Sequence, residues 1–349
     1  MNHKRLLKLF FSFLLLLNCY SCEKKISHAK INGKTMGTTY NITIPQQENI
    51  KLDLKHIQTS VEKKLIALNQ SLSTYIESSE ISQFNRFKAD TWMNVSKDMF
   101  LVSQKAQEIA ILTDYYFDPT LAPLINLWGF GYTDSIGVPK QSEIDALLPL
   151  IGMDKIDIAQ NIVYQMRKKS DDIQLDYSAI AKGYAVDQIS LLLQDMGYKN
   201  HYVEIGGELI VKGFRDAKQQ AWKIAVENPQ NNEVSKRAVF KTLNLSDMAM
   251  ATSGDYRNFF MHQGKKYNHT LIPSTGYPSQ HKTRSVTVLH KNCMDADAFA
   301  TGLLAMGYPE AFKLANNLGL AALFIVEKES GNLMAYTSNY LLELEKKNG

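Results

Sequence analysis

Strand-like and helix-like segments follow one another along this chain without strict alternation. In residues 52–72 apolar residues recur at steps of three and four, as in an amphipathic helix, whereas residues 201–213 have the order strand, Gly-Gly, strand. A doubly wound parallel sheet needs regular alternation of the two kinds of segment, so this order argues against it. The pattern instead predicts an α+β fold, with mixed antiparallel sheets and flanking helices in a single two-lobed catalytic unit.

The predicted elements are short and numerous. Hairpins are expected at 29–44, 201–213, 256–270 and 320–337, and further strands at 156–166, 173–177, 222–226, 239–245 and 285–289. Helices are expected at 52–72, at 96–112 with Ser96 as cap, and at 142–150, 178–196, 295–306 and 309–318. No shift in composition marks an internal boundary, so residues 29–340 are taken as one domain and residues 341–349 as a C-terminal tail.

The N-terminus forms a separate unit. Residues 1–21 combine a basic start with an apolar run, and Cys22 follows directly after Ser21. This order is typical of a secretory signal rather than of a spanning helix. A cysteine in this place after a small residue indicates a bacterial lipoprotein signal, in which Cys22 carries lipid and residues 22–28 form a tether. A secretory signal without lipid is the alternative.

Charge and cysteine content exclude other classes. The whole chain has a net charge of +4, and three of its positive charges lie within residues 1–21. The remaining chain is therefore nearly neutral and contains no Lys/Arg block, which argues against nucleic-acid binding. Once Cys22 is lipidated, Cys293 is the other cysteine of the mature chain, so no intramolecular disulfide is available and the core must supply the stability.

Familiar catalytic signatures such as the P-loop, G-x-G-x-x-G, H-E-x-x-H and G-x-S-x-G are missing. What remains are polar clusters at the edges of predicted elements. The first cluster, Asp176–Asp187, is a turn that leads into a helix, where unpaired N–H groups favour an anion such as phosphate. Lys182 lies in the first turns, where a cation needs a negative partner. The alternative is an ordinary helix start capped by Asp176 or Ser178.

The second cluster lies within Asp295–Gly302. Asp297 and Thr301 are four residues apart, so their side chains share one face of a helix. A carboxylate and a hydroxyl, completed by carbonyl and phosphate oxygens, suit Mg²⁺. The alternative is a helix that simply begins with favourable acids, and this is the stronger interpretation for Asp295.

Two further features stand at strand ends. His269 precedes a Pro- and Gly-containing turn, where an imidazole can act as a general base, although a structural histidine is the alternative. Gly206 and Gly207 join two strands, which indicates either a bulge or close approach of the backbone to a ligand.

Taken together, these segments resemble the ApbE family, the FAD:protein FMN transferases. The matching segments occur in family order over nearly all of the mature chain. They are Thr35–Tyr40, Leu72–Tyr75, Ser79–Ser82, Phe117–Thr120, Pro123–Gly131, Asp176–Asp187, Glu204–Glu208, Ala251–Arg257, His269–Pro278 and Asp295–Gly302. The lipoprotein-like start fits the resemblance, which implies a protein of the bacterial cell envelope, lipid-anchored on the exported, periplasmic side of the cytoplasmic membrane.

The resemblance implies an activity and a set of site residues. The expected enzyme requires Mg²⁺, cleaves FAD, transfers FMN through a phosphoester bond to a Thr or Ser hydroxyl of an exported or membrane acceptor protein, and releases AMP. The implied Mg²⁺ ligands are Asp297, the Thr301 hydroxyl and the Ala179 carbonyl, and His269 is the implied base for the acceptor hydroxyl. Relatives often have Asp where this chain has Ala300. The implied flavin contacts are Met36, Tyr75, Phe117, Asp118, Asp176, Lys182 and Leu271.

Two other functions remain open at this stage. A Mg²⁺-dependent FAD pyrophosphatase, which yields FMN and AMP, would use the same site with water in place of the acceptor hydroxyl. A non-catalytic flavin-binding lipoprotein is the alternative from a different class, and Asp297, Thr301 and His269 argue against it.

Overall fold

The computed structural model describes residues 27–46, 52–131, 137–216, 218–229, 238–256 and 258–348. The predicted signal 1–21, the lipidation site Cys22, most of the expected tether and Arg257 lie outside these ranges. Within the described ranges, no helix has the length and apolar character needed to cross a membrane.

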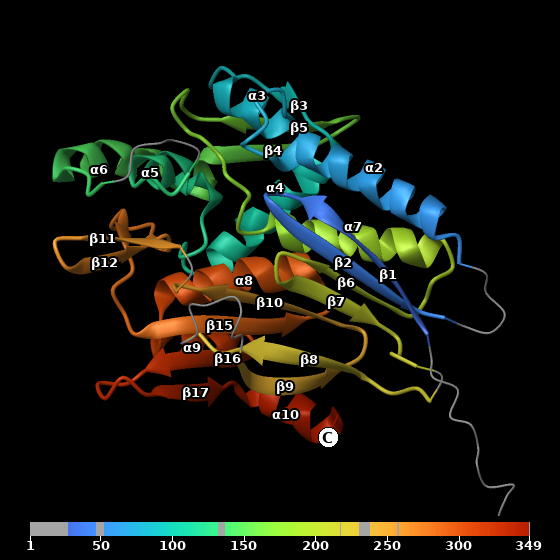
Figure 1. The fold of residues 1–349 in the computed structure, drawn as a ribbon. Helices are drawn as coiled ribbons and strands as arrows, with labels where there is room; N and C mark the ends of the chain where they lie inside the picture. Colours follow the sequence, from blue (N-terminus) through green and yellow to red (C-terminus); the bar gives the residue numbers. More distant parts are fainter. Residues whose placement is uncertain are drawn as a thin grey trace, which may run out of the picture.

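An eight-stranded sheet forms the centre of the molecule (Figure 1). Its neighbouring strands pair antiparallel throughout, which confirms the predicted α+β class with antiparallel sheets. In spatial order the strands are β1 (His28–Thr35), β2 (Thr38–Pro45), β6 (His201–Ile205), β7 (Glu208–Lys212), β10 (Met248–Gly254), β15 (Thr283–His290), β16 (Ala321–Glu327) and β17 (Leu333–Thr337).

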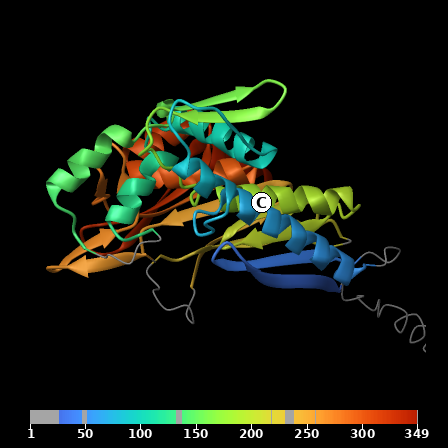
Figure 2. The same ribbon diagram turned by 90° about the horizontal axis from the view of Figure 1, so that it is seen from above.

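Both faces of this sheet are covered. On one face lie α7 (Ala181–Asp195) and α8 (Cys293–Met306), and on the other lie the hairpin β8 (Trp222–Glu227) and β9 (Val239–Leu245) and helix α10 (Asn339–Asn348) (Figures 1 and 2). Strand β16 shows why: Phe324 belongs to the main core beneath the helices, whereas Leu323 and Ile325 belong to the smaller core beneath the hairpin. A strand buried on both faces is apolar along its length rather than alternating.

The remaining elements surround this centre. Above α7 and α8 lie α2 (Leu54–Leu72), α3 (Glu80–Arg86), α4 (Lys97–Leu112) and a small sheet of β3 (Met93–Asn94), β5 (Tyr164–Lys168) and β4 (Ile156–Gln160). A third cluster around Trp128 joins α5 (Ala122–Leu127) and α6 (Gln141–Leu147) to two small hairpins, β11 (Phe259–His262) with β12 (Lys265–Asn268) and β13 (Leu271–Ile272) with β14 (Tyr277–Pro278). Helix α9 (Glu310–Asn317) and the 3₁₀ turns η2 (Pro119–Leu121), η3 (Leu148–Leu150) and η4 (Met153–Lys155) complete the order.

Most predicted elements are confirmed, but the prediction of a strand at 173–177 is wrong. Side chains satisfy the backbone of this segment in place of a neighbouring strand. The Asn85 amide donates to the carbonyl of Leu175 at 2.9 Å and accepts its N–H at 2.7 Å. The buried Lys168 ammonium donates to the carbonyls of Asn85 at 2.6 Å and Ile173 at 3.0 Å. These contacts hold the chain directly before Asp176.

A helix start, a strand and the C-terminal segment also differ from the expectation. Helix α7 begins at Ala181 rather than at 178, because Asp176 holds residue 178 in a turn outside the helix. Strand β10 was missed because Ala249 and Ala251 have low strand propensity, and pairing with β7 and β15 on its two sides overrides it. Residues 341–348, expected as a tail, lie in α10, whose Leu341 is only 1% exposed in the smaller core.

Asp187 of α7 holds the first turn of α8. Its carboxylate accepts the N–H groups of Cys293 at 2.8 Å and Met294 at 2.9 Å, two donors that have no partner within their own helix. Burial raises the pKa of Asp187 to about 7, so the folded chain binds this proton more tightly than the unfolded chain does. The stability that this proton provides is therefore greatest at low pH and falls as the pH rises toward 7.

We expect Asp187→Ala to lower the free energy of unfolding by about 1–3 kcal/mol, because it leaves two buried N–H groups unpaired. Asp187→Asn retains one acceptor and should lose less. The difference in free energy of unfolding between the parent and Asp187→Asn should become smaller from about pH 5 to about pH 8. Only the parent has a carboxyl group at this position, so only the parent loses stability as that group loses its proton. Urea unfolding of the three proteins at both pH values measures this, and equal stability of Asp187→Ala and the parent would contradict the capping role.

Candidate active site

A cavity of about 800 Å³ lies where the ends of the central strands meet α8 and the loops before α7. It is lined by almost all of the predicted site residues, which come from widely separated parts of the sequence. Those lining it are Tyr75, Phe117, Asp118, Asp176, Ala179, Lys182, His269, Leu271, Asp297 and Thr301. Met36 is not among the lining residues; it lies in the turn between β1 and β2 with φ 49°.

Asp297 and Thr301 lie on one face of α8, as their spacing predicts. The Asp297 carboxylate accepts the N–H of Gly183, in the first turn of α7, at 3.0 Å. The Thr301 hydroxyl lies 3.0 Å from the Ser253 hydroxyl near the end of β10. Both side chains are therefore held from a neighbouring element and reach the cavity from its floor.

Gly183 allows α7 and α8 to approach closely enough for this contact. A Cβ at position 183 would lie 2.4 Å from the Cys293 carbonyl oxygen and 2.8 Å from the Cβ of Asp297. Because the first of these is backbone, a side chain could be admitted only by moving α8. The position of Asp297 therefore depends on the absence of a side chain at 183.

Lys182 is the cation that compensates the buried acids of the cavity. Its ammonium donates to the Ser178 carbonyl at 2.9 Å and lies 3.7 Å from the carboxylate of Glu208 and 3.9 Å from that of Asp297. Burial by itself lowers the pKa of Lys182, but these two carboxylates outweigh burial and raise it above its ordinary value. The sequence-based requirement for a negative partner at this position is thus met from β7 and α8.

The two carboxylates are held in an unfavourable environment for charge. Burial raises the pKa of Glu208 to about 8, although Lys182 partly opposes the shift. Burial likewise raises the pKa of Asp297, again against Lys182. One oxygen of Glu208, Oε2, is buried without a hydrogen-bond partner. Additional positive charge would therefore stabilise the ionised pair.

The oxygen atoms on the floor of the cavity fit a hard cation. A carboxylate, a hydroxyl and the nearby Ala179 carbonyl are the oxygen ligands that Mg²⁺ prefers. In the part of the chain that the structure describes, no group of three or more His, Cys, Asp or Glu is arranged to hold a metal. Ala300 is buried in the main core and offers no oxygen, so water and ligand oxygens would have to complete a Mg²⁺ shell.

The opposite wall of the cavity is built from loops that side chains fix. Asp118 caps η2, accepting the N–H of Thr120 at 2.9 Å and its hydroxyl at 2.6 Å. Asp176 accepts the N–H of Ser178 at 2.7 Å. Asp176 therefore fixes a turn before α7 rather than capping the helix, whose N-cap residue is Ile180, and Asp176 also lines the cavity. Tyr75 is 68% exposed and stands at the rim.

His269 follows β12 directly and lines the cavity, and one of its two ring nitrogens is hydrogen-bonded within the protein. Its Nδ1 lies 3.1 Å from the carbonyl oxygen of Asn258, so Nδ1–H donates and Nε2 is the acceptor nitrogen. Burial lowers the pKa of His269, opposed by the Asn258 carbonyl and by Asp255. The imidazole is accordingly neutral at neutral pH, which is the form that a general base needs.

Comparison with known proteins identifies the family of this chain. Residues 36–324 match the model of the ApbE family. The chain belongs to the ApbE family. It is 39% identical over 318 residues to the FAD:protein FMN transferase of Vibrio cholerae serotype O1, covering 90% of this chain and 92% of that one. It is 34% identical over 331 residues to that of Haemophilus influenzae, covering 94% and 95%.

Solved structures of the ApbE family have the same fold. The flavin transferase ApbE from Vibrio cholerae superposes with a TM-score of 0.82 at 36% identity, covering 91% of this chain and 99% of that one. The apo form of the Pseudomonas stutzeri flavinyl transferase ApbE gives a TM-score of 0.83 at 32% identity, covering 92% and 97%. The predicted family and fold are therefore confirmed.

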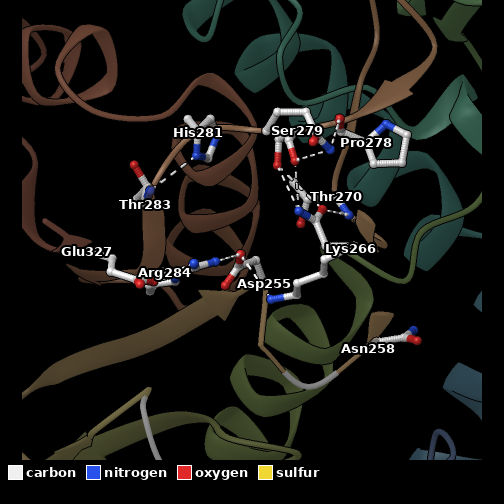
Figure 3. Close-up of polar contacts among 12 residues, drawn as sticks. Asp255, Asn258, Lys266, Thr270, Pro278, Ser279, His281, Thr283, Arg284 and Glu327 are labelled. Atoms are coloured by element: carbon white, nitrogen blue, oxygen red, sulfur yellow. Dashed lines mark hydrogen bonds and ion pairs between the residues drawn. The ribbon is translucent and has the colours of Figure 1, made fainter. Parts of the chain in front are cut away.

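Two buried charged groups, one lining the cavity and one outside its lining, were not predicted from the sequence. Glu208 lies in the cavity and pairs with Lys182, and an acid at the start of an otherwise apolar strand was the available signal. Asp255, only 2% exposed, accepts from Arg284 Nη1 at 2.7 Å and from Lys266 at 3.4 Å, as Figure 3 shows. Asp255 thus connects β12, which leads directly to His269, with β15 of the central sheet.

We expect Gly183→Ala to weaken cation and FAD binding, because the new methyl group displaces α8 and with it Asp297. Alanine is ordinarily favoured over glycine within a helix by about 0.5–1 kcal/mol, so a loss of stability would identify the clash. Gly137→Ala is the matched control, since a Cβ at 137 meets open space. Calorimetric titration with Mg²⁺ and FAD measures the effect, and parent-like binding by Gly183→Ala would contradict the close contact.

Proposed function

We propose that this protein is an FAD:protein FMN transferase of the bacterial cell envelope. It cleaves FAD, releases AMP and joins FMN through a phosphoester bond to a Thr or Ser hydroxyl of an exported or membrane acceptor protein. Membership of the ApbE family and the similarity to the transferases of V. cholerae and H. influenzae support this activity. FAD is the substrate, and the acceptor is a flavoprotein in its unmodified form.

One observation carries the proposal: a single cavity brings together oxygen donors for a cation, a fixed ammonium group and a neutral imidazole. Asp297 and Thr301 stand on the floor, Lys182 lies beside them and His269 reaches in from the hairpin. Transfer of a phosphoryl-type group needs neutralised phosphate charge, an aligned nucleophile and an acceptor for its proton. Each need has a residue in this cavity.

The residues divide between holding FAD and moving a proton. Asp297, Thr301 and the Ala179 carbonyl would hold Mg²⁺, which when bound neutralises charge on the pyrophosphate. Tyr75, Phe117, Asp118, Asp176 and Leu271 line the cavity and would contact the flavin, and Lys182 would stand beside the phosphates. His269 Nε2 takes the proton of the acceptor hydroxyl, and the Asn258 carbonyl holds the ring in the tautomer that permits this.

The test is transfer itself. Incubation of the protein with FAD, Mg²⁺ and a candidate acceptor protein, followed by intact mass measurement, should show the acceptor gaining one FMN. His269→Ala should reduce that transfer by about 10²–10⁴-fold while FAD binding persists, because the base is lost and the binding residues remain. The parent rate should fall on acidification only below the ordinary imidazole pKa, since burial lowers the pKa of His269.

Two outcomes would decide against the proposal in different ways. Release of FMN and AMP with an unmodified acceptor would identify a pyrophosphatase, with water as nucleophile. FAD binding without either product would identify a flavin-binding lipoprotein. Parent-rate transfer by His269→Ala would reduce this histidine to a structural role.

We further propose that Cys22 anchors the protein by lipid on the periplasmic side of the cytoplasmic membrane. The order of basic start, apolar run, Ser21 and Cys22 in the sequence supports this. Cys22→Ser should move the protein from the membrane fraction to the soluble fraction while leaving FAD binding unchanged. Release by Cys19→Ser but not by Cys22→Ser would place the lipid on the other early cysteine.

A further inference from the structure

The hairpin β11–β12 connects two segments that line the cavity. Tyr256 and Asn258 precede β11 and line the cavity, and His269 and Leu271 follow β12 and line it as well. The hairpin therefore adjoins the cavity wall beside His269. Figure 1 shows it below α5 and α6, at the side of the molecule. A polypeptide that presents a hydroxyl group to His269 therefore comes close to the hairpin.

The two faces of the hairpin differ in how they are used. Phe260 and Tyr267 pair across the strands and pack on the cluster around Trp128, with the Trp128 and Tyr267 ring centroids 5.5 Å apart. The opposite face carries Phe259, which is 39% exposed, and Met261, which is 59% exposed. Two large apolar side chains thus stand side by side in solvent on a supported strand, and within the described residues no element covers them.

The base of this hairpin is rigid. The Asn268 amide donates to the Ser279 carbonyl at 2.9 Å and its oxygen accepts the N–H of Thr270 at 2.9 Å. Lys266 donates to Asp255 (Figure 3). Its ammonium also stands over the Phe259 ring, 4.7 Å from the ring centroid. The exposed face is therefore preformed, so a partner can bind it without first ordering it.

The hairpin is also positively charged in a chain that is close to neutral. Residues 259–268 contain Lys265, Lys266 and His262 but no Asp or Glu, and Lys266 pairs with Asp255 outside the hairpin. At the tip of the hairpin, Lys265 has no ion-pair partner among the described residues and lies next to the exposed His262. Such a surface favours a partner that combines apolar side chains with negative charge.

We propose that the face formed by Phe259, Met261 and Lys266, together with Lys265 at the tip, docks an acidic, partly apolar segment of the acceptor protein beside its target hydroxyl. This inference rests on the proposed transferase function and adds a binding surface outside the FAD cavity. Lys265 attracts the acidic residues, Lys266 stays paired with Asp255 beside the Phe259 ring, and Phe259 and Met261 bury the apolar residues. The occupant is the acceptor polypeptide, because the surface leads along β12 to His269.

The test uses the full-length protein in detergent and two fluorescently labelled peptides. Each peptide contains one Thr flanked by leucines, with aspartates in the first and lysines in the second. The variants are Lys265→Glu and Met261→Ser, neither of which lines the cavity. The matched controls are Lys63→Glu on α2 and Met334→Ser on β17, where the original side chains are also exposed.

Fluorescence anisotropy should show that the parent binds the acidic peptide about tenfold more tightly than the basic one, and less tightly as salt is added. Lys265→Glu and Met261→Ser should each weaken that binding by about three- to tenfold, with FAD affinity and both controls unchanged. Absence of binding to the acidic peptide, equal binding of both peptides, or equal losses in the control variants would overturn the docking surface. Mass measurement of FMN transfer is a separate readout, so binding without transfer would count against the proposed function and leave the docking surface standing.

Discussion

The close contact between α7 and α8 determines where the charged groups of the cavity lie. Gly183 lets the two helices meet backbone to side chain, and its N–H fixes the Asp297 carboxylate. One turn further along α7, Asp187 holds the first N–H groups of α8, so each helix caps or positions the other. Because Lys182 is the neighbour of Gly183, the same contact places the cavity cation beside the cavity acids. The positions of Asp297 and Lys182 therefore depend on the absence of a side chain at Gly183.

That arrangement concentrates charge where water is scarce. Glu208 and Asp297 are both buried, and burial raises the pKa of each, so a single ammonium does not fully compensate them. A structure built only for stability would replace such a group with apolar residues, because buried ion pairs often cost as much as they contribute. In the proposed reaction the cation held with the FAD phosphates would supply positive charge beside these carboxylates, and the oxygen donors of Asp297 and Thr301 fit that proposal.

Local sequence patterns predicted the elements whose signals are local. Helix α4 begins after Ser96, whose side chain accepts the N–H of Met99 at 3.1 Å, as the cap pattern indicates. Strand β10 has no such signal, since its small residues become a strand only between β7 and β15. The prediction for 173–177 was wrong for a different reason. The apolar residues of this segment suggest a strand, but the distant Asn85 and the nearby Lys168 bind its backbone groups. Among the site residues, Asp297 and Thr301 could be paired by helical spacing, whereas the contact of Lys182 with Glu208 exists only in the folded chain.

His269 links the chemistry to the part of the surface that an acceptor must approach. Its ring is oriented by the carbonyl of Asn258 on one side of the hairpin, and its backbone continues from β12 on the other. Any displacement of the hairpin would therefore move the base as well as the surface beside it. The Asp255 network and the cluster around Trp128 prevent that displacement by tying the hairpin to the central sheet and to α5. In the proposed reaction His269 acts on a hydroxyl supplied by another protein. The hairpin would then hold the proposed docking surface and the nitrogen that takes the proton in one unit, which favours their alignment.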